Sequence, residues 1–329
     1  MKGDLSHLAR SLAVALLLSA CSDNEVEMKQ QECQSLSAEE VQLTGGTFTM
    51  GADPLLPEEG PPREVTVGSF AIDRTEVTNG QFAAFVDATN HVTLAERPLS
   101  AASYPQLTPE QRLPSSVVFD AQRGWRVVQG ANWRHPFGPG SSIVGREDHP
   151  VVQVAQEDAL AYARWAGRDL PTEAEWEFAA RGGLDDARFT SGSSPEKSGR
   201  PHANYWQGVF PHADTGADGF AATSAPVGCF PPNGFGLHDM AGNVWEWTSD
   251  WYRPGIDQAP SSPSRESAYD PAEPDVAKHV IKGGSYLCAD NYCFRYRPSA
   301  RQAGPPDSGS SHVGFRTVRR SAVSLEPRR

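Results

Sequence analysis

Short stretches of alternating apolar and polar residues, separated by glycine and proline, run through much of this chain. Residues 45–51 alternate small and apolar side chains between glycines, and residues 63–73 alternate with period two. Side chains that alternate in this way lie on opposite faces of a strand, so both stretches predict strands. Residues 81–86 begin a helical pattern, and Thr78 can cap that helix by accepting from its free backbone N–H groups.

Two further helices are predicted in the middle of the chain. Residues 157–165 carry Ala159, Leu160, Ala163 and Trp165 as one apolar stripe at helical spacing. Farther along, Thr172 and Glu175 have the spacing of a capping box, and the glycine pair 182–183 ends that helix.

Some polar residues in this part of the chain could suggest acid–base chemistry. Glu173, Glu175 and Glu177 lie at a helix start, where the macrodipole stabilises acidic side chains, so we interpret them as structural. Arg134 and His135 lie beside a tryptophan and two prolines, and we expect them to fix an irregular loop.

The remaining segments are rich in loops. Residues 93–125 contain many prolines and serines without clear periodicity, which predicts a long and functional loop, and residues 251–275 are similar. With 27 prolines and 30 glycines, the chain is expected to fold as one loop-rich α+β domain over about residues 42–320, followed by a tail at 321–329.

The N-terminus has the layout of an export signal. Lys2 and Arg10 precede the apolar run 12–18, which is too short to span a bilayer. Residues 1–20 are therefore predicted to be a signal peptide. The net charge of −12 argues against nucleic acid or anionic lipid as a partner.

Cys21 follows Leu18-Ser19-Ala20, a sequence that resembles a bacterial lipobox. We expect Cys21 to be lipidated and the domain to be held outside the cytoplasm, in the periplasm or an equivalent space, touching membrane only through that anchor. The alternative is an ordinary cleaved signal. Residues 21–41 are polar and acidic and predict a flexible tether. Cys33 lies in this tether, and the sequence leaves open whether it pairs with Cys229.

Two more cysteines, Cys288 and Cys293, are five residues apart. At this spacing they point away from each other on a straight strand or helix, so they meet only if the backbone turns between them. Asp290 and Asn291 supply residues that favour such a turn. Two thiols that meet can form a disulfide or hold a soft metal ion, and thiolates select copper(I). In an exported protein the disulfide is a strong alternative.

The sequence around this pair resembles the active-site region of formylglycine-generating enzymes, which oxidise a cysteine of sulfatases to Cα-formylglycine. The resemblance rests on Gly283-Gly284-Ser285-Tyr286, on the run Tyr292-Cys293-Phe294-Arg295-Tyr296-Arg297, and on Gly314-Phe315-Arg316. It extends through most of residues 43–318. It implies a distant variant of the C-type lectin fold.

The resemblance also implies a chemistry. Cys288 and Cys293 would hold copper(I) between two thiolates, with a substrate cysteine as third ligand. O₂ would be the oxidant, and the substrate cysteine would become an aldehyde with release of sulfide. The implied partner is a sulfatase chain with an extended Cys-x-Pro-x-Arg segment, whose arginine suits an acidic protein. We expect the protein to act as a monomer.

Further site residues follow from the same resemblance. Ser285 would act beside the thiols as a hydrogen-bonding catalytic residue. Glu76 could equally be a solvated charge at a helix entry, and Trp245 could be buried core. The residues expected to line the substrate groove are Glu76, Ser116, Trp245, Tyr286, Arg301 and His312.

Two loops carry the hard oxygen ligands that calcium prefers. Both could otherwise be turns with solvated acids. By resemblance the first calcium site comprises Asn204, Tyr205, Asp218 and Phe220, and the second comprises Asp239, Gly242, Val244 and Glu246. By the same resemblance, Tyr205 and Phe220 in the first site and Gly242 and Val244 in the second would act through their backbone carbonyl oxygens.

A rival function belongs to a different class. A lipid-anchored protein of the same fold could bind a partner or a glycan without catalysis, with Cys288 and Cys293 as a plain disulfide. Oxidation of a Cys-x-Pro-x-Arg peptide would separate the two functions.

Overall fold

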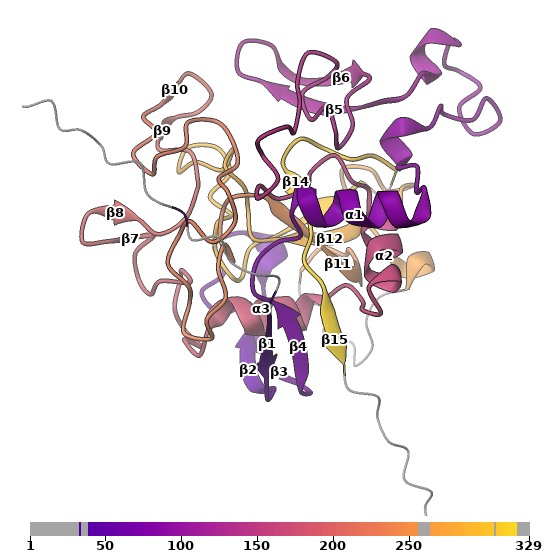
Figure 1. Ribbon diagram of the computed structural model, residues 1–329. Coiled ribbons are helices and arrows are strands. Elements are labelled where there is room, and N and C mark those ends of the chain that lie inside the picture. The colour runs from indigo at the N-terminus through magenta and orange to yellow at the C-terminus, as the bar shows by residue number, and fades with distance from the viewer. Residues whose placement is uncertain (1–32, 34–38, 256–263, 306, 321–329) are drawn as a thin grey trace, which may run out of the picture. The chain divides into compact units, whose positions relative to one another are not determined.

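The computed structural model describes residues 33, 39–255, 264–305 and 307–320 (Figure 1). The predicted signal peptide, the predicted lipidation site Cys21, most of the predicted tether and the tail at 321–329 lie outside these residues. Within the described segments, no helix is both long enough and apolar enough to cross a bilayer.

A four-stranded sheet supports the cysteine segment. Its strand order is β13–β12–β11–β14, with β12 antiparallel to both of its neighbours and β14 parallel to β11. Tryptophan, threonine, valine and isoleucine in the two central strands favour extended backbone. The strands are β11 (Trp245–Trp251), β12 (His279–Lys282), β13 (Arg301–Gly304) and β14 (Val313–Gly314).

A second sheet joins the beginning and the end of the domain. β4 (Phe70–Asp73) is its central strand, between β1 (Glu40–Leu43) and β15 (Val318–Arg320), and all pairs are antiparallel. β1 begins two residues before the expected domain start at 42.

The single strand predicted over residues 63–73 is two strands. β3 (Arg63–Val67) pairs with β2 (Gly46–Met50) as a hairpin, whereas β4 belongs to the second sheet. The strand is interrupted at residues 68–69 because β3 pairs with β2, whereas β4 pairs with β1 and β15. The strand predicted over residues 45–51 is confirmed by β2.

The three predicted helices are confirmed. Their caps explain their bounds: the Thr78 and Thr172 hydroxyls accept from the N–H groups of Gln81 and Glu175, and Gly182 ends the third helix in the left-handed conformation. The helices are α1 (Asn79–Thr89), α2 (Gln156–Trp165) and α3 (Glu173–Arg181).

The prediction of an irregular loop over residues 93–125 is wrong in part. β5 (Ser115–Asp120) and β6 (Gly124–Gln129) form an antiparallel hairpin that turns at Gly124, whose φ is +73° (Figure 1). Most of β6 is exposed, so its sequence carries no alternating apolar face that would predict the hairpin. Short elements complete the description: β7 (Glu196–Lys197), β8 (Arg200–Pro201), β9 (Gly208–Val209), β10 (Ala213–Asp214), and the 3₁₀ turns η1 (Pro57–Glu59), η2 (Leu94–Glu96), η3 (Glu110–Arg112) and η4 (Arg265–Ser267).

Two apolar clusters form the core. One lies between α1, α2 and the four-stranded sheet, and Cys288 and Cys293 belong to it. The other packs α3 against β2, β3 and β4. α3 also contacts β11 and β12, so it ties the two sheets together beneath the cysteine segment.

Candidate active site

Cys288 and Cys293 lie side by side on a tight turn. Their sulfur atoms are bonded as a disulfide, and their Cα atoms are 4.5 Å apart. The backbone turns through residues 290–292, as predicted, and the N–H of Cys293 donates to the Ala289 carbonyl at 3.0 Å. Cys288 is 1% exposed and Cys293 is 7% exposed, so the second sulfur is nearer the solvent.

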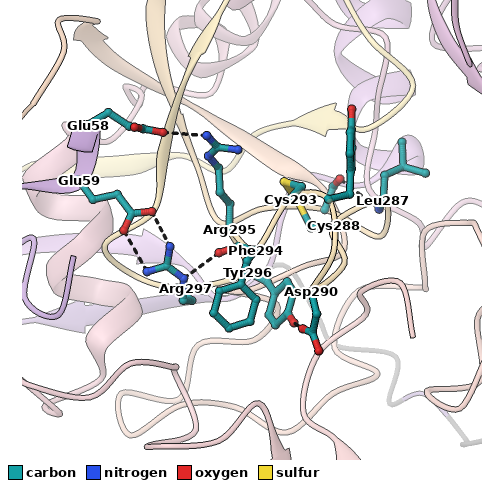
Figure 2. The surroundings of a disulfide bond; sticks show 12 residues. Glu58, Glu59, Leu287, Cys288, Asp290, Cys293, Phe294, Arg295, Tyr296 and Arg297 are labelled. Atoms are coloured by element: carbon teal, nitrogen blue, oxygen red, sulfur yellow. Dashed lines mark hydrogen bonds and ion pairs between the residues drawn. A yellow bond between two sulfur atoms is a disulfide. The ribbon is translucent and has the colours of Figure 1, made fainter. Parts of the chain in front are cut away.

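Two arginines fasten the end of this turn to η1 (Figure 2). Arg297 forms a two-pronged ion pair with Glu59, with N–O distances of 2.5 and 3.0 Å, and both side chains are fully buried. Arg295 pairs with Glu58 at 2.7 Å in a partly exposed position. Paired, bidentate guanidinium–carboxylate contacts fix orientation, so the turn is held in one place.

Gly284 permits the close packing at the start of the turn. Its φ is +74°, and a Cβ at this position would lie 2.8 Å from the backbone nitrogen of Tyr296. A residue with a side chain would therefore push the two halves of the cysteine segment apart.

Ser285 and Tyr286 support the turn from within the protein. The Ser285 hydroxyl is buried and accepts from the Leu287 N–H at 3.3 Å. The Tyr286 hydroxyl donates to the Ser311 carbonyl at 3.1 Å, and burial raises the pKa of Tyr286 to about 12. Tyr286 is 2% exposed, and its expected contact with a substrate stays a prediction.

An aromatic surface lies next to Cys293. We call Trp125, Phe210 and Tyr292 the aromatic platform. Tyr292 stacks on Phe210 with ring centroids 4.1 Å apart, and the Trp125 indole N–H donates to the Tyr292 hydroxyl at 3.2 Å. Trp125 is 41% exposed and Tyr292 is 50% exposed. The sequence analysis missed this platform; the available signal was an aromatic residue directly before Cys293 and another directly after the Gly124 turn.

His312 contacts the aromatic platform through Trp125, and its expected contact with substrate stays a prediction. Its ring centroid is 4.7 Å from that of Trp125, and its Nδ1 is 2.6 Å from the Ser310 hydroxyl. Burial lowers the pKa of His312 to about 3, so the imidazole is neutral near pH 7. A neutral imidazole can both donate and accept, as an amide side chain would.

Three of the residues expected to line the groove are buried in the structure. Trp245 is fully buried in the core, where β11 packs against α2. The Ser116 hydroxyl donates to the Gly309 carbonyl at 2.8 Å and is also buried. The Arg301 guanidinium binds Glu173 and the carbonyls of residues 253 and 255. The three side chains therefore pack or bond within the protein, and their expected contact with a substrate stays a prediction.

Glu76, also expected in the groove, is buried as well. Its carboxyl group is 1% exposed and accepts from the Asn243 amide at 3.0 Å. Burial, together with the negative charge of Asp239, raises the pKa of Glu76 well above its usual range. Glu76 therefore contacts the second predicted calcium loop through Asn243.

The first predicted calcium loop has a donor set that fits the ion. Asn204 Oδ1 is buried without a hydrogen-bond partner. Asp218 is buried, which raises its pKa to about 6, and it accepts from the N–H groups of Phe220 and Tyr205. The Tyr205 carbonyl accepts from the Gln207 amide. Oxygen donors from side chains and backbone on one loop suit calcium.

The second predicted calcium loop fits in part. Asp239 Oδ1 is buried and has no hydrogen-bond partner, so this oxygen could coordinate a cation. Both oxygens of Glu246, in contrast, accept from Arg316, and one also accepts from the Trp176 indole. Asp239, Gly242 and Asn243 all have positive φ, and a Cβ on Gly242 would lie 2.1 Å from the Asn204 carbonyl oxygen. The two loops therefore touch through backbone.

The structure joins Cys33 to Cys229 in a disulfide, which settles the pairing that the sequence left open. Their Cα atoms are 4.3 Å apart. The tether is thus fixed to the domain at residue 33.

The structural interpretation of the other polar residues is confirmed. Glu173 pairs with Arg301, Glu175 with Arg320, and Glu177 with Arg181 and Lys282. His135 Nδ1 lies 2.6 Å from the Ser141 carbonyl and Arg134 pairs with Glu96, so both fix their loop.

Comparison with known proteins agrees with this arrangement. The chain is 49% identical to the formylglycine-generating enzyme of Mycobacterium tuberculosis over 290 residues, covering 84% of this chain and 96% of that protein. It is 42% identical to the mouse protein named inactive C-alpha-formylglycine-generating enzyme 2, covering 84% of each chain. The solved structure of PvdO from Pseudomonas aeruginosa superposes with a TM-score of 0.60 at 28% identity, over 87% of this chain and 95% of PvdO. The profile of the sulfatase-modifying factor enzyme 1-like domain matches residues 25–321, and the chain therefore belongs to that family.

Proposed function

We propose that this protein matures sulfatases by oxidising one of their cysteines to Cα-formylglycine. The observation that carries the proposal is the Cys288–Cys293 pair, held on a rigid turn beside an exposed aromatic platform, in a chain 49% identical to a named formylglycine-generating enzyme. The platform offers an extended peptide a surface next to the two sulfurs. Aromatic side chains of this kind commonly anchor peptides.

The two sulfurs, once reduced, would hold copper(I), since paired thiolates on one turn are a soft donor set that fits this ion. When bound, copper supplies the oxidation chemistry with O₂. The chain positions the substrate: Trp125 and Tyr292 contact the peptide, and the buried Ser285 and Tyr286 keep the cysteine turn in place. Neutral His312 provides a hydrogen-bonding group that carries no charge near pH 7.

A second candidate function is a non-catalytic binding protein. Its support is the bond between the two sulfurs and the 42% identity to a mouse protein named inactive. In that case the aromatic platform would bind a partner without changing it.

Mass spectrometry of a Cys-x-Pro-x-Arg peptide separates the two functions. The full chain is reduced, loaded with copper(I) and incubated with the peptide and O₂. We expect an aldehyde in place of the peptide thiol, and we expect its loss in Cys288→Ser and Cys293→Ser. Cys33→Ser is the matched control and should retain the activity, because Cys33 is paired with Cys229. An unchanged peptide with copper-loaded protein would favour the binding protein.

We also propose that the protein is exported and lipid-anchored through Cys21. The Cys33–Cys229 disulfide supports export, since such bonds persist mainly outside the cytoplasm. Labelling cells with a fatty-acid analogue should mark the wild type and leave Cys21→Ala unmarked. Equal labelling of both would reject the anchor.

A further inference from the structure

Arg146, in the loop between β6 and α2, is a partly buried arginine without an acidic partner. Within the described segments it forms no ion pair, and the groups that it contacts are neutral. The next two residues, Glu147 and Asp148, are exposed, and Glu147 Oε1 accepts from the Gly145 N–H instead. A positive charge that is partly removed from water without a counter-charge is unfavourable, so this guanidinium has a vacancy for an anion.

Three neutral side chains hold one nitrogen of this guanidinium. Nη2 donates to the Thr223 hydroxyl at 2.8 Å and to the Ser224 hydroxyl at 3.3 Å. It also lies 3.1 Å from His149 Nδ1. Nε and Nη1 of Arg146 donate to none of the described residues. The guanidinium is therefore positioned through Nη2, and its other two nitrogens remain for a further acceptor.

His149 and Thr223 add donors beside the same charge. Burial, together with the charge of Arg146, lowers the pKa of His149 to about 4, so the imidazole is neutral near pH 7. A guanidinium only donates, so His149 Nδ1 accepts and the neutral ring carries its proton on Nε2. The Thr223 hydroxyl accepts from Arg146 and keeps its own hydrogen to donate. Neither donor has an acceptor among the described residues.

Backbone contacts fix the two segments that carry these side chains. The Arg146 carbonyl accepts from the Asn79 amide at 2.9 Å and from the His149 N–H at 3.1 Å. The Thr223 carbonyl accepts from the Asn204 amide at 2.9 Å. The donors are thus held in place by bonds that do not involve their own polar atoms.

We propose that Arg146, His149 and Thr223 bind a small tetrahedral oxyanion of the sulfate or phosphate class. The guanidinium supplies the positive charge and N–H groups whose fork geometry matches such anions. A tetrahedral anion presents oxygens in several directions, as donors from two segments of the chain require, whereas a carboxylate presents two oxygens in one plane. None of the three residues belongs to the cysteine turn or the aromatic platform, so the proposal does not depend on the proposed function.

Calorimetric titration of the full chain with sodium sulfate or sodium phosphate, in chloride buffer at constant ionic strength, tests this site. We expect the wild type to bind one anion per chain saturably, and Arg146→Gln to bind it at least about tenfold more weakly. Arg164→Gln is the matched control, because it removes the same charge from an exposed position on α2, and it should bind as the wild type does. Acetate should bind the wild type at least about tenfold more weakly than sulfate.

Thr223→Val supplies a second variant that keeps the charge of Arg146. It removes one hydroxyl at nearly constant volume and leaves the Thr223 carbonyl in place for Asn204. We expect it to weaken sulfate binding by about tenfold. Sulfate stabilises folded proteins in general, but that effect is common to all variants. The rise in unfolding temperature with sulfate should therefore be larger for wild type than for Arg146→Gln or Thr223→Val.

Four results would overturn the proposal. The wild type could show no saturable binding of sulfate or phosphate. Arg146→Gln and Thr223→Val could both bind with the affinity of the wild type. Arg164→Gln could weaken binding as much as Arg146→Gln does, which would assign the effect to net charge. Acetate could bind as tightly as sulfate, which would make the site a carboxylate site. If Arg146→Gln is unfolded by circular dichroism, the comparison of wild type with Thr223→Val decides.

Discussion

At the scale of single residues, the position of the cysteine turn depends on one buried ion pair. Arg297 and Glu59 are fully buried and bonded to each other, whereas the neighbouring pair of Arg295 and Glu58 is partly exposed. Breaking a buried pair leaves an uncompensated charge, but breaking an exposed pair costs little.

Glu59→Gln is therefore expected to lower the free energy of unfolding by about 3–5 kcal/mol, measured in urea. Glu58→Gln, the matched control from the same 3₁₀ turn, should cost less than about 1 kcal/mol. Similar losses in the two variants would show that burial of the first pair is not what stabilises the turn.

His312 gives a prediction for pH. Its pKa is lowered to about 3 in the folded protein from an ordinary value near 6.5, so the unfolded chain binds a proton more readily. The stability that neutral His312 contributes is thus complete above pH 6.5 and is lost as the pH falls from 6.5 toward 3.

Comparing wild type with His312→Asn isolates this effect from the carboxyl groups. Below pH 6.5 the wild type should lose up to about 1.4 kcal/mol per pH unit more than the variant, measured by urea unfolding at pH 7, 6 and 5. Parallel pH profiles would show that His312 titrates normally in the folded protein.

Single residues also mark the limit of the sequence analysis. The turn between Cys288 and Cys293 was predictable because the residues that cause it are local. The burial of Arg301 and Glu76 was not predictable from the sequence, because the direction of each side chain depends on distant neighbours such as Glu173 and Asp239.

At the scale of elements, the helices followed from local signals and one hairpin did not. The helix bounds could be predicted because the capping contacts of Thr78, Thr172 and Gly182 join residues only a few positions apart in the sequence. Strand β6 of the β5–β6 hairpin is mostly exposed, and Trp125 near the hairpin turn contacts His312. A strand without a buried face leaves little periodicity to detect.

This hairpin makes a testable contribution to substrate binding. Trp125→Ala should lower kcat/KM for the Cys-x-Pro-x-Arg peptide by about tenfold or more, because truncating an aromatic anchor commonly costs over 1 kcal/mol of binding. Val127→Ala, on the same strand and 69% exposed, is the control and should leave kcat/KM unchanged. Equal effects of both would indicate that the hairpin as a whole, rather than the indole, matters.

At the scale of the whole molecule, the Cys33–Cys229 disulfide closes a loop between residues 196 positions apart. In the chain-entropy description, a loop of this length stabilises the folded state by up to about 5 kcal/mol, since it restricts the unfolded chain.

Cys33→Ser should lower the unfolding midpoint under non-reducing conditions, and adding Cys229→Ser should lower it little further. A reducing agent should bring the wild type toward the single variant. An unchanged midpoint in Cys33→Ser would show that the N-terminal segment adds nothing to the stability of the domain.

Asn243 connects parts of the molecule that are far apart in the sequence. Its amide bonds Glu76, its Oδ1 accepts from Asn204, and its backbone carbonyl accepts from the Tyr286 N–H at the entrance to the cysteine turn. A calcium ion held by the two predicted calcium loops would thus stabilise the position of the Cys288 and Cys293 sulfurs without contacting them. A chelator selective for hard ions should then abolish the proposed oxidase activity while copper(I) stays bound.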